Sequence, residues 1–228
     1  MKPILHFAPD NASLCVRLAL EEAGVAYDTA LVDRAARGQR APGYLALNPN
    51  GLIPTLVTGD GPVFETAAIL LWLAGNGGAA LMPAPDAPGR GAALSWLFWL
   101  SNTLHPALRQ LFYPDRYIDG GAQAALTRAT RNRVAGMLDL LEGAAPDVLS
   151  PGTATLHTCY LCPMLRWLAL YPRGDTDWFA LSGWPGLFAL AQATETRPAS
   201  LRAAGAEGLG PTPFSAPRPP TPPIGSAT

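Results

Sequence analysis

Two residues at the start of a predicted helix, Glu65 and Thr66, have the types and the position to bind a carboxylate. They follow a turn and open an apolar run that extends to Ala74, which predicts that a helix begins there. The first N–H groups of a helix have no partner inside it, and the helix dipole makes its start positive. A carboxylate ligand is therefore expected here, although the same residues could do no more than cap the helix.

The stretch before this helix has the pattern of a turn, a proline and a hairpin. Residues 48–51 are Asn-Pro-Asn-Gly, a dense turn signal, and residues 55–58 are predicted to be a strand. Pro54 stands at the mouth of that strand, where its missing N–H excludes a central position in a sheet. We therefore predict a cis peptide bond between Ile53 and Pro54. Residues 59–61, Gly-Asp-Gly, then predict a tight turn into a second strand.

This series of motifs resembles the glutathione-binding core of the cytosolic glutathione S-transferase superfamily. The resemblance runs from about residue 4 to about residue 210. It implies that glutathione is a co-substrate and that the backbone N–H and C=O of Ile53, exposed by the cis bond to Pro54, pair with its cysteinyl unit as an added strand would. It also implies that Glu65 and Thr66 hold the γ-glutamyl end of glutathione.

The group that activates glutathione is expected in the loop between the first strand and the first helix. Transfer requires a thiolate, whereas a free thiol with a pKa of about 8.5 is mostly protonated at neutral pH. The loop most resembles that of the bacterial beta class, in which a cysteine precedes a serine. Here Ala12 occupies the cysteine position and Ser13 is the serine. The tyrosine of other classes would fall near Phe7, which has no hydroxyl.

Ser13 is thus predicted to be the catalytic hydroxyl, with Asn11 of the same loop as the alternative donor. An ordinary helix-capping role is the competing interpretation of Ser13. Cys15 lies two residues further along the helix and is rotated by about 200° from Ser13. We therefore interpret Cys15 as a core residue. The missing cysteine at position 12 argues against thiol-exchange chemistry.

Three more residue types suited to chemistry occur in the second half of the chain. His105 matches a histidine that faces the active site in beta-class relatives, which makes it a candidate for substrate binding; a plain place in the domain interface is the alternative. His157 stands in the first turn of a helix, where the dipole disfavours its charged form. Cys159 and Cys162 form a C-x-x-C pair without further zinc ligands at suitable spacing. Because a redox pair would follow the first strand instead, we interpret them as core residues and expect no metal site.

The elements that must position these residues fall into two domains. A strand at 3–7, a helix at 13–23 ended by Gly24, a strand at 27–32 and a short irregular helix at 42–47 precede the hairpin and helix described above. This order predicts a thioredoxin-like α/β domain over residues 1–75, followed by a linker at 76–89.

The rest of the chain is predicted to be helical up to residue 204. Apolar residues recur at helical spacing over 92–112, 122–144, 155–171 and 185–196, which indicates an all-α domain at 90–204 and, with the first domain, the glutathione S-transferase fold. Pro106 and Pro163 are expected to kink or break two of these helices. Residues 205–228, rich in Pro, Gly, Ser and Thr, are predicted to be an extended or disordered tail.

Composition favours a globular protein whose partners are small molecules or other proteins. Hydrophobic residues make up 49% of the chain and the net charge is −1, which gives no electrostatic case for nucleic acid or an anionic membrane as a partner. The first apolar run is too short for a secretory signal and no run is long enough to span a membrane. Three cysteines do not suggest a disulfide framework, so the cytoplasm is the expected location.

Two functions remain open at this point. The first is a transferase, as in detoxification, that conjugates the thiolate of glutathione to a small hydrophobic electrophile. Its pocket would be walled by aromatic side chains of the second domain, namely Trp96, Trp99, Phe112 and Tyr113. The second is a non-catalytic glutathione-binding or regulatory protein with the same fold. The resemblance also implies a homodimer, for which the apolar run at 69–73 is a candidate contact.

Overall fold

A four-stranded sheet forms the centre of the first domain. The computed structural model describes residues 1–149 and 153–227. Its strands are β1 (Ile4–Phe7), β2 (Asp28–Leu31), β3 (Thr55–Thr58) and β4 (Gly61–Phe64), in the order β2-β1-β3-β4. β1 pairs parallel with β2 and antiparallel with β3, and β3 pairs antiparallel with β4.

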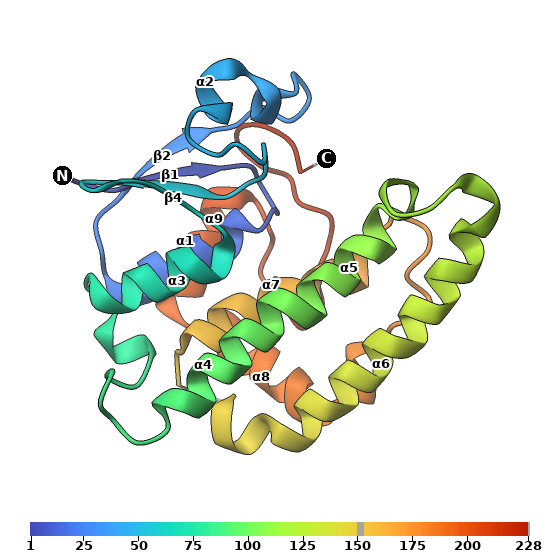
Figure 1. Cartoon of the computed structure of the whole chain (residues 1–228). Helices are drawn as coiled ribbons and strands as arrows, with labels where there is room; N and C mark the ends of the chain where they lie inside the picture. The colour runs from blue at the N-terminus through green and yellow to red at the C-terminus, as the bar shows by residue number, and fades with distance from the viewer. Residues whose placement is uncertain (150–152, 228) are drawn as a thin grey trace.

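Three helices complete this domain. Helices α1 (Ser13–Ala23) and α3 (Thr66–Gly75) cover one face of the sheet, and the short α2 (Pro42–Leu45) lies on the other side, as Figure 1 shows. The apolar faces of α1 and α3 pack on the sheet, where Leu5 and Leu56 have no exposed surface. The predicted thioredoxin-like α/β domain is confirmed.

Local signals in the sequence set the ends of several of these elements. Gly24 ends α1 with a φ of 64°, a left-handed conformation that glycine adopts without steric cost. Gly61, at a φ of 112°, returns the chain from β3 into β4. The Ile53–Pro54 peptide bond is cis, so that prediction is confirmed.

The second domain is helical over its described residues. Its helices are α4 (Arg90–Trp99), α5 (His105–Phe112), α6 (Gln123–Val148), α7 (Leu156–Leu170), α8 (Pro185–Glu195) and α9 (Pro198–Glu207). Figure 1 shows α4 and α5 as one long rod beside the first domain. α9 was not predicted, although Pro198 at its first position and Gly208 just past its end, at a φ of 64°, are ordinary start and stop signals.

The two helix prolines have different effects. Residues 100–104, just before Pro106, form a π-turn in which the N–H of His105 donates to Leu100 O, so the missing donor of the proline is absorbed by a wider turn. α7, in contrast, runs without a break through Pro163. The predicted disruption is therefore present at Pro106, while the helix continues through Pro163.

A shared apolar core joins the two domains. α1 packs against α7 and α9, and the Arg17–Glu207 ion pair, at 2.8 Å, links α1 to α9. Cys15, Cys159 and Cys162 are all buried in this region. Burial is the main cause that raises the pKa of the Cys162 thiol to about 12, as expected for thiols that pack rather than react. None of the helices in the described residues is long and apolar enough to cross a membrane.

The Pro-rich segment after α9 returns along the first domain to the region of α2, as Figure 1 shows. Between 208 and 227 it has neither helix nor strand, but it is tied down at several points. Thr221 N–H donates to Gly208 O at 2.8 Å, and the side chain of Phe214 is 1% exposed. The last residue of the predicted tail, Thr228, lies outside the described residues.

Candidate functional site

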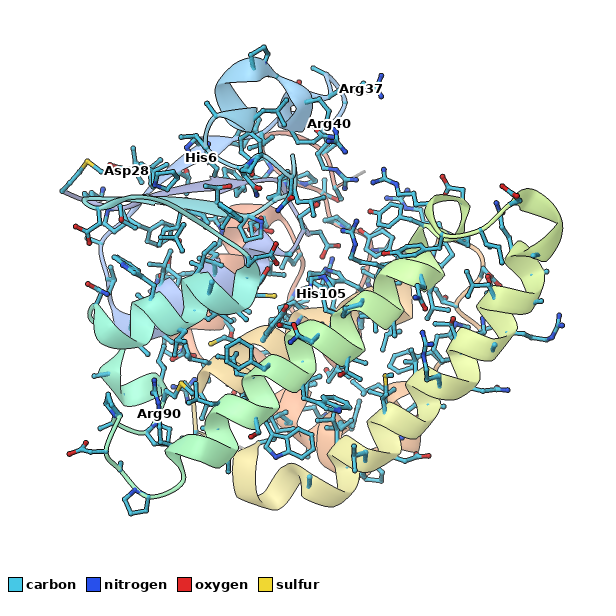
Figure 2. All side chains as sticks on the ribbon, viewed as in Figure 1. His6, Asp28, Arg37, Arg40, Arg90 and His105 are labelled. Carbon is cyan, nitrogen blue, oxygen red and sulfur yellow. The ribbon has the colours of Figure 1, made fainter. Side chains whose placement is uncertain are left out.

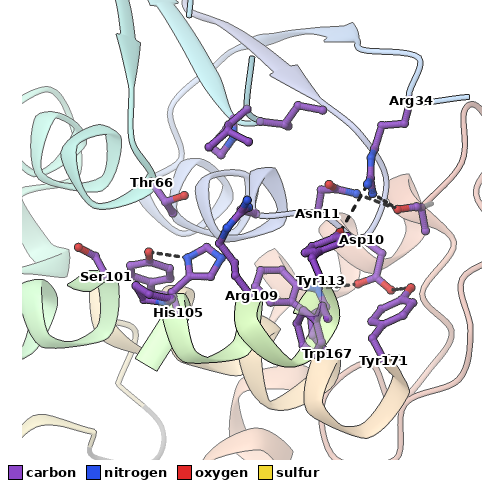
Figure 3. Close-up of a pocket in the computed structure, with 18 of the residues that line it drawn as sticks. Asp10, Asn11, Arg34, Thr66, Ser101, His105, Arg109, Tyr113, Trp167 and Tyr171 are labelled. Atoms are coloured by element: carbon purple, nitrogen blue, oxygen red, sulfur yellow. Dashed lines mark hydrogen bonds between the residues drawn. The ribbon is translucent and has the colours of Figure 1, made fainter. Parts of the chain in front are cut away.

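A cavity of about 640 Å³ opens where the two domains meet. The first domain contributes the loop between β1 and α1, residues 52–54 and the start of α3, and the second contributes α5, α7 and the segment after each of them. Figure 3 shows these side chains converging from both domains. The cavity is lined by six of the predicted site residues: Asn11, Ile53, Pro54, Glu65, Thr66 and His105.

The start of α3 faces the cavity with an unusual backbone conformation. Glu65 precedes the helix at a φ of 70° and a ψ of 122°, a region that non-glycine residues rarely occupy and that clusters at functional sites. Thr66 is the first helical residue and is only 6% exposed. The free N–H groups of this first turn are therefore available to an anion in the cavity.

The loop that carries Ile53 is fixed by side chains around it. Tyr44 Oη and Asn48 Nδ2 both donate to Leu52 O, at 2.6 and 2.8 Å. Ile53 itself takes part in none of the backbone hydrogen bonds that join loops and turns in the described part of the chain. Its N–H and C=O are therefore free for a ligand in the cavity that it lines.

Ser13 does not lie where the sequence analysis expected it. Its side chain is fully buried and is not part of the cavity wall. The hydroxyl donates to Ala8 O at 3.0 Å and accepts from Ala8 N–H at 3.3 Å, so it braces the turn between β1 and α1. The capping interpretation also differs from the structure, because Ala12 is the N-cap of α1 and makes no side-chain cap.

Asn11 and Ala12, together with Asp10, form the part of this loop that lines the cavity. Asn11 Nδ2 donates to Pro9 O at 2.9 Å and to Ala227 O, near the end of the chain, at 3.1 Å. Ala12 has no polar side chain, and Cys15 is fully buried away from the cavity. Asn11 is thus the polar side chain of this loop that lines the cavity without an ion-pair partner, since Asp10 is paired with Arg166.

Asp10 holds the loop in place and was missed by the sequence analysis. It has a φ of 52° and is 5% exposed. Its carboxylate accepts hydrogen bonds from Arg166, Trp167 and Tyr171, at 2.7–3.1 Å. The only signal in the sequence is Arg166, a single charge within the otherwise apolar helix at 156–170, since a buried arginine requires an anionic partner.

His105 faces the cavity from α5, next to the first domain (Figure 2). Its Nδ1 lies 2.9 Å from Tyr160 Oη of α7. Burial, and then the charge of Arg109, lower the pKa of His105 to about 4, so the imidazole is neutral at pH 7. The neutral ring can donate or accept a hydrogen bond at the cavity wall, but it adds no charge. His157 lies elsewhere, buried, with Nε2 2.7 Å from Ala93 O.

The aromatic wall of the cavity differs in part from the prediction. Phe112 and Tyr113 line it, whereas Trp96 lines a separate small pocket beside His157 and Trp99 lines neither. The residues that the prediction missed come from α7 and from the chain after α5 and α7: Tyr117, Tyr160, Trp167 and Tyr171. The π-turn before His105 accompanies this difference, because it changes the helix face that follows it.

The charged groups of the wall are mostly positive. Arg34, Arg109 and Arg173 line the cavity together with Asp10 and Glu65. The charge of Asp10 is balanced by Arg166, at 2.8 Å. The described residues contain no group of three or more His, Cys, Asp or Glu side chains that could hold a metal ion.

Comparison with known proteins identifies the family. The family description "Glutathione S-transferase, N-terminal domain" matches residues 12–75. Glutathione S-transferase 3 of Zea mays is 32% identical over 150 residues, which cover 62% of this chain and 67% of that protein. The disulfide-bond oxidoreductase YfcG of Escherichia coli (strain K12) is 39% identical over 113 residues, 46% of this chain, and the match spans about half of that relative's length, 52%.

A solved structure agrees over the whole fold. A sphingomonad glutathione S-transferase complexed with glutathione is 28% identical and has a TM-score of 0.74. The alignment covers 91% of this chain and all of that one. With the fold, the cavity and the relatives in agreement, the chain belongs to the glutathione S-transferase family.

Proposed function

We propose that the chain binds glutathione in this cavity and transfers the glutathione thiolate to a small electrophile. The observation that carries the proposal is that Ile53, the start of α3 and the loop before α1 line one cavity. This lining offers backbone groups for the cysteinyl unit, a helix start for a carboxylate and the Asn11 side chain for the sulfur. The glutathione in the related sphingomonad structure supports the same ligand here.

The γ-glutamyl end of glutathione binds at the start of α3. The carboxylate of Glu65 pairs with the γ-glutamyl ammonium, and the first N–H groups of the helix, with the Thr66 hydroxyl, bind the adjacent carboxylate. Ile53 N–H and C=O pair with the cysteinyl backbone, which directs the sulfur toward the loop between β1 and α1.

Asn11, rather than Ser13, is the side-chain donor to the sulfur in this proposal. Asn11 lines the cavity, whereas the Ser13 hydroxyl is bonded to Ala8. The glutathione proton leaves to solvent, the thiolate attacks the electrophilic carbon, a C–S bond forms, and the leaving group departs with its electron pair. Ala12, in place of the beta-class cysteine, has no thiol that could form a mixed disulfide with glutathione.

The electrophile binds against the second domain. Phe112, Tyr113 and Tyr171 present aromatic surface to the cavity, which suits a small hydrophobic molecule. His105 contributes a neutral hydrogen-bonding group beside Tyr160 and contacts the bound substrates.

Thermal unfolding with and without glutathione tests the binding step. A ligand at 100 times its Kd stabilises the folded state by about 2.7 kcal/mol, a rise in Tm of roughly 5–10 °C for a chain of this size. Glu65→Gln should reduce this rise. An unchanged Tm at millimolar glutathione would remove the binding claim. A normal rise in Tm without conjugation of chlorodinitrobenzene would instead leave a non-catalytic glutathione-binding protein.

A homodimer is the proposed assembly. Leu71 and Trp72 of α3 are only partly buried, and Phe98 of α4 is 46% exposed, so both helices keep apolar surface that a second copy would cover. Light scattering should give twice the 23.9 kDa of one chain. A mass of a single chain at micromolar concentration would refute this assembly.

A further inference from the structure

Arg109 is a partly buried cation on the cavity wall without a partner. Among the described residues, no hydrogen bond or ion pair engages its guanidinium, and its neighbour is the ring of Tyr113, 5.7 Å from the centroid. The other two cavity arginines are satisfied, since Arg34 donates to Ala227 O at 2.5 Å and Arg173 is exposed to water. A partly desolvated charge without a partner is unfavourable, which points to an anion supplied by the ligand.

The direction of Arg109 shows which part of a ligand it would meet. In Figure 3 the side chain extends from α5 toward the first domain and ends between Thr66 and Asn11 in that view. All three residues line the same cavity. The guanidinium therefore points toward the part of the first domain to which the proposed glutathione pose directs the sulfur.

The charges around the cavity are matched to a thiolate rather than a thiol. Asp10 is neutralised by Arg166, and His105 is neutral at pH 7. The other charged residues of the lining are Glu65 and three arginines, Arg34, Arg109 and Arg173, which leaves two positive charges in excess among the described residues of the wall. Glutathione with an ionised sulfur has two carboxylates, one thiolate and one ammonium, hence two negative charges in excess. With a neutral thiol it has only one.

We propose that Arg109 is a catalytic residue that lies against the sulfur of bound glutathione and stabilises its thiolate form. This inference rests on the proposed function. In it, a cation of the second domain acts beside the neutral Asn11 amide, because the first domain offers no hydroxyl at the positions expected from the sequence: Phe7 has none, and that of Ser13 is bonded to Ala8. The thiol proton goes to water, and Arg109 keeps its own proton and charge throughout. No bond to Arg109 forms or breaks.

The test is the pH titration of thiolate absorbance for glutathione bound to wild type, Arg109→Gln and Arg109→Lys. An opposite charge within about 4–6 Å lowers the pKa of an acid by about 1–3, so Arg109→Gln should raise the pKa of the bound thiol by about 1–2. The rate of conjugation below that pKa should fall roughly 10- to 100-fold. Arg109→Lys, which keeps the charge, should restore part of both.

Two matched controls separate this role from others. Arg128 is exposed on α6, outside the cavity, so Arg128→Gln should leave the titration unchanged. S-methylglutathione has no ionisable sulfur, so Arg109→Gln should weaken its binding less than about twofold. If Arg109→Gln does not fold, Arg109→Met, which preserves apolar packing on Tyr113, takes its place.

Three outcomes would overturn the inference. An unchanged pKa of the bound thiol in the folded Arg109→Gln or Arg109→Met protein rules out a contact with the sulfur. Equal weakening of glutathione and S-methylglutathione places Arg109 on another part of the tripeptide. If wild type binds neither compound, the proposed function itself fails and the inference with it, whereas the first two outcomes leave glutathione binding intact.

Discussion

Arg166 of α7 donates two hydrogen bonds to the carboxylate of Asp10 in the first domain, from Nε to Oδ1 at 2.8 Å and from Nη2 to Oδ2 at 3.1 Å. Neither side chain has exposed surface. The same guanidinium donates to Pro213 O and Arg218 O of the Pro-rich segment. One buried arginine thus connects the loop that carries Asn11, the helical domain and the C-terminal segment.

Arg166→Met should lower the free energy of unfolding by about 3–5 kcal/mol, because it leaves the Asp10 carboxylate buried without its counter-charge. Urea denaturation measures this loss. Arg202→Met is the matched control, since Arg202 pairs with Glu21 at 2.6 Å but its side chain is 56% exposed, and such surface pairs contribute about 0–1 kcal/mol. Equal losses for the two variants would mean that the buried pair has no special role.

Asn11→Ala should raise the pKa of the bound glutathione thiol by about 1, because it removes one hydrogen bond to a charged acceptor. Ser13→Ala should leave that pKa unchanged and cost about 1 kcal/mol of stability, through the lost bonds to Ala8. Thiolate absorbance against pH and urea denaturation report the two effects. A raised thiol pKa in Ser13→Ala would return the catalytic role to that hydroxyl.

His105 should make the protein less stable as the pH falls from about 6.5 to about 4. Burial and Arg109 lower its pKa to about 4 in the folded state, whereas the unfolded chain takes up this proton near pH 6.5. The contribution to the free energy of unfolding is complete above pH 6.5 and, at 1.36 kcal/mol per pKa unit, decreases by up to about 3 kcal/mol toward pH 4. Chemical denaturation across this range measures it.

The control for this effect is His105→Gln, which has no proton to bind. The difference in stability between wild type and this variant should change with pH only between about 4 and 6.5. Arg109→Gln should raise the pKa of His105, because the charge of Arg109 contributes to its low value, and histidine NMR titrations would detect this. A constant difference across the range would show that His105 titrates normally.

Deletion of residues 223–228 should increase conjugation a few-fold and lower the pKa of the bound thiol. Asn11 has two N–H donors, and they are used by Pro9 O and Ala227 O. Because donation to the sulfur requires release of one acceptor, removal of Ala227 favours it. Deletion of the tail in an Asn11→Ala background should have no such effect. If the deletion lowers the activity of the protein that has Asn11, but not that of Asn11→Ala, Ala227 O orients the Asn11 amide for catalysis instead of competing for it.

The elements of the first domain and the place of Ile53, Glu65 and Thr66 in the cavity lining could be predicted because their signals are local. Gly24 and Gly61 adopt positive φ values that the turn signals require, and Pro54 stands where only a special backbone geometry is acceptable. Ile53, Glu65 and Thr66 follow these signals at short range. Their position on one cavity wall therefore depends on few contacts that are distant in sequence.

The orientation of the side chains in the loop between β1 and α1 was decided only by the tertiary structure. The sequence places Ser13 and Asn11 in one loop, but whether a hydroxyl faces a cavity or Ala8 depends on how Asp10 is held by Arg166, 156 residues away. The unpaired state of Arg109 likewise depends on which carboxylates the fold brings near it. Hydrogen bonds and ion pairs between distant segments form after the chain has packed, so residue type and local periodicity do not specify them.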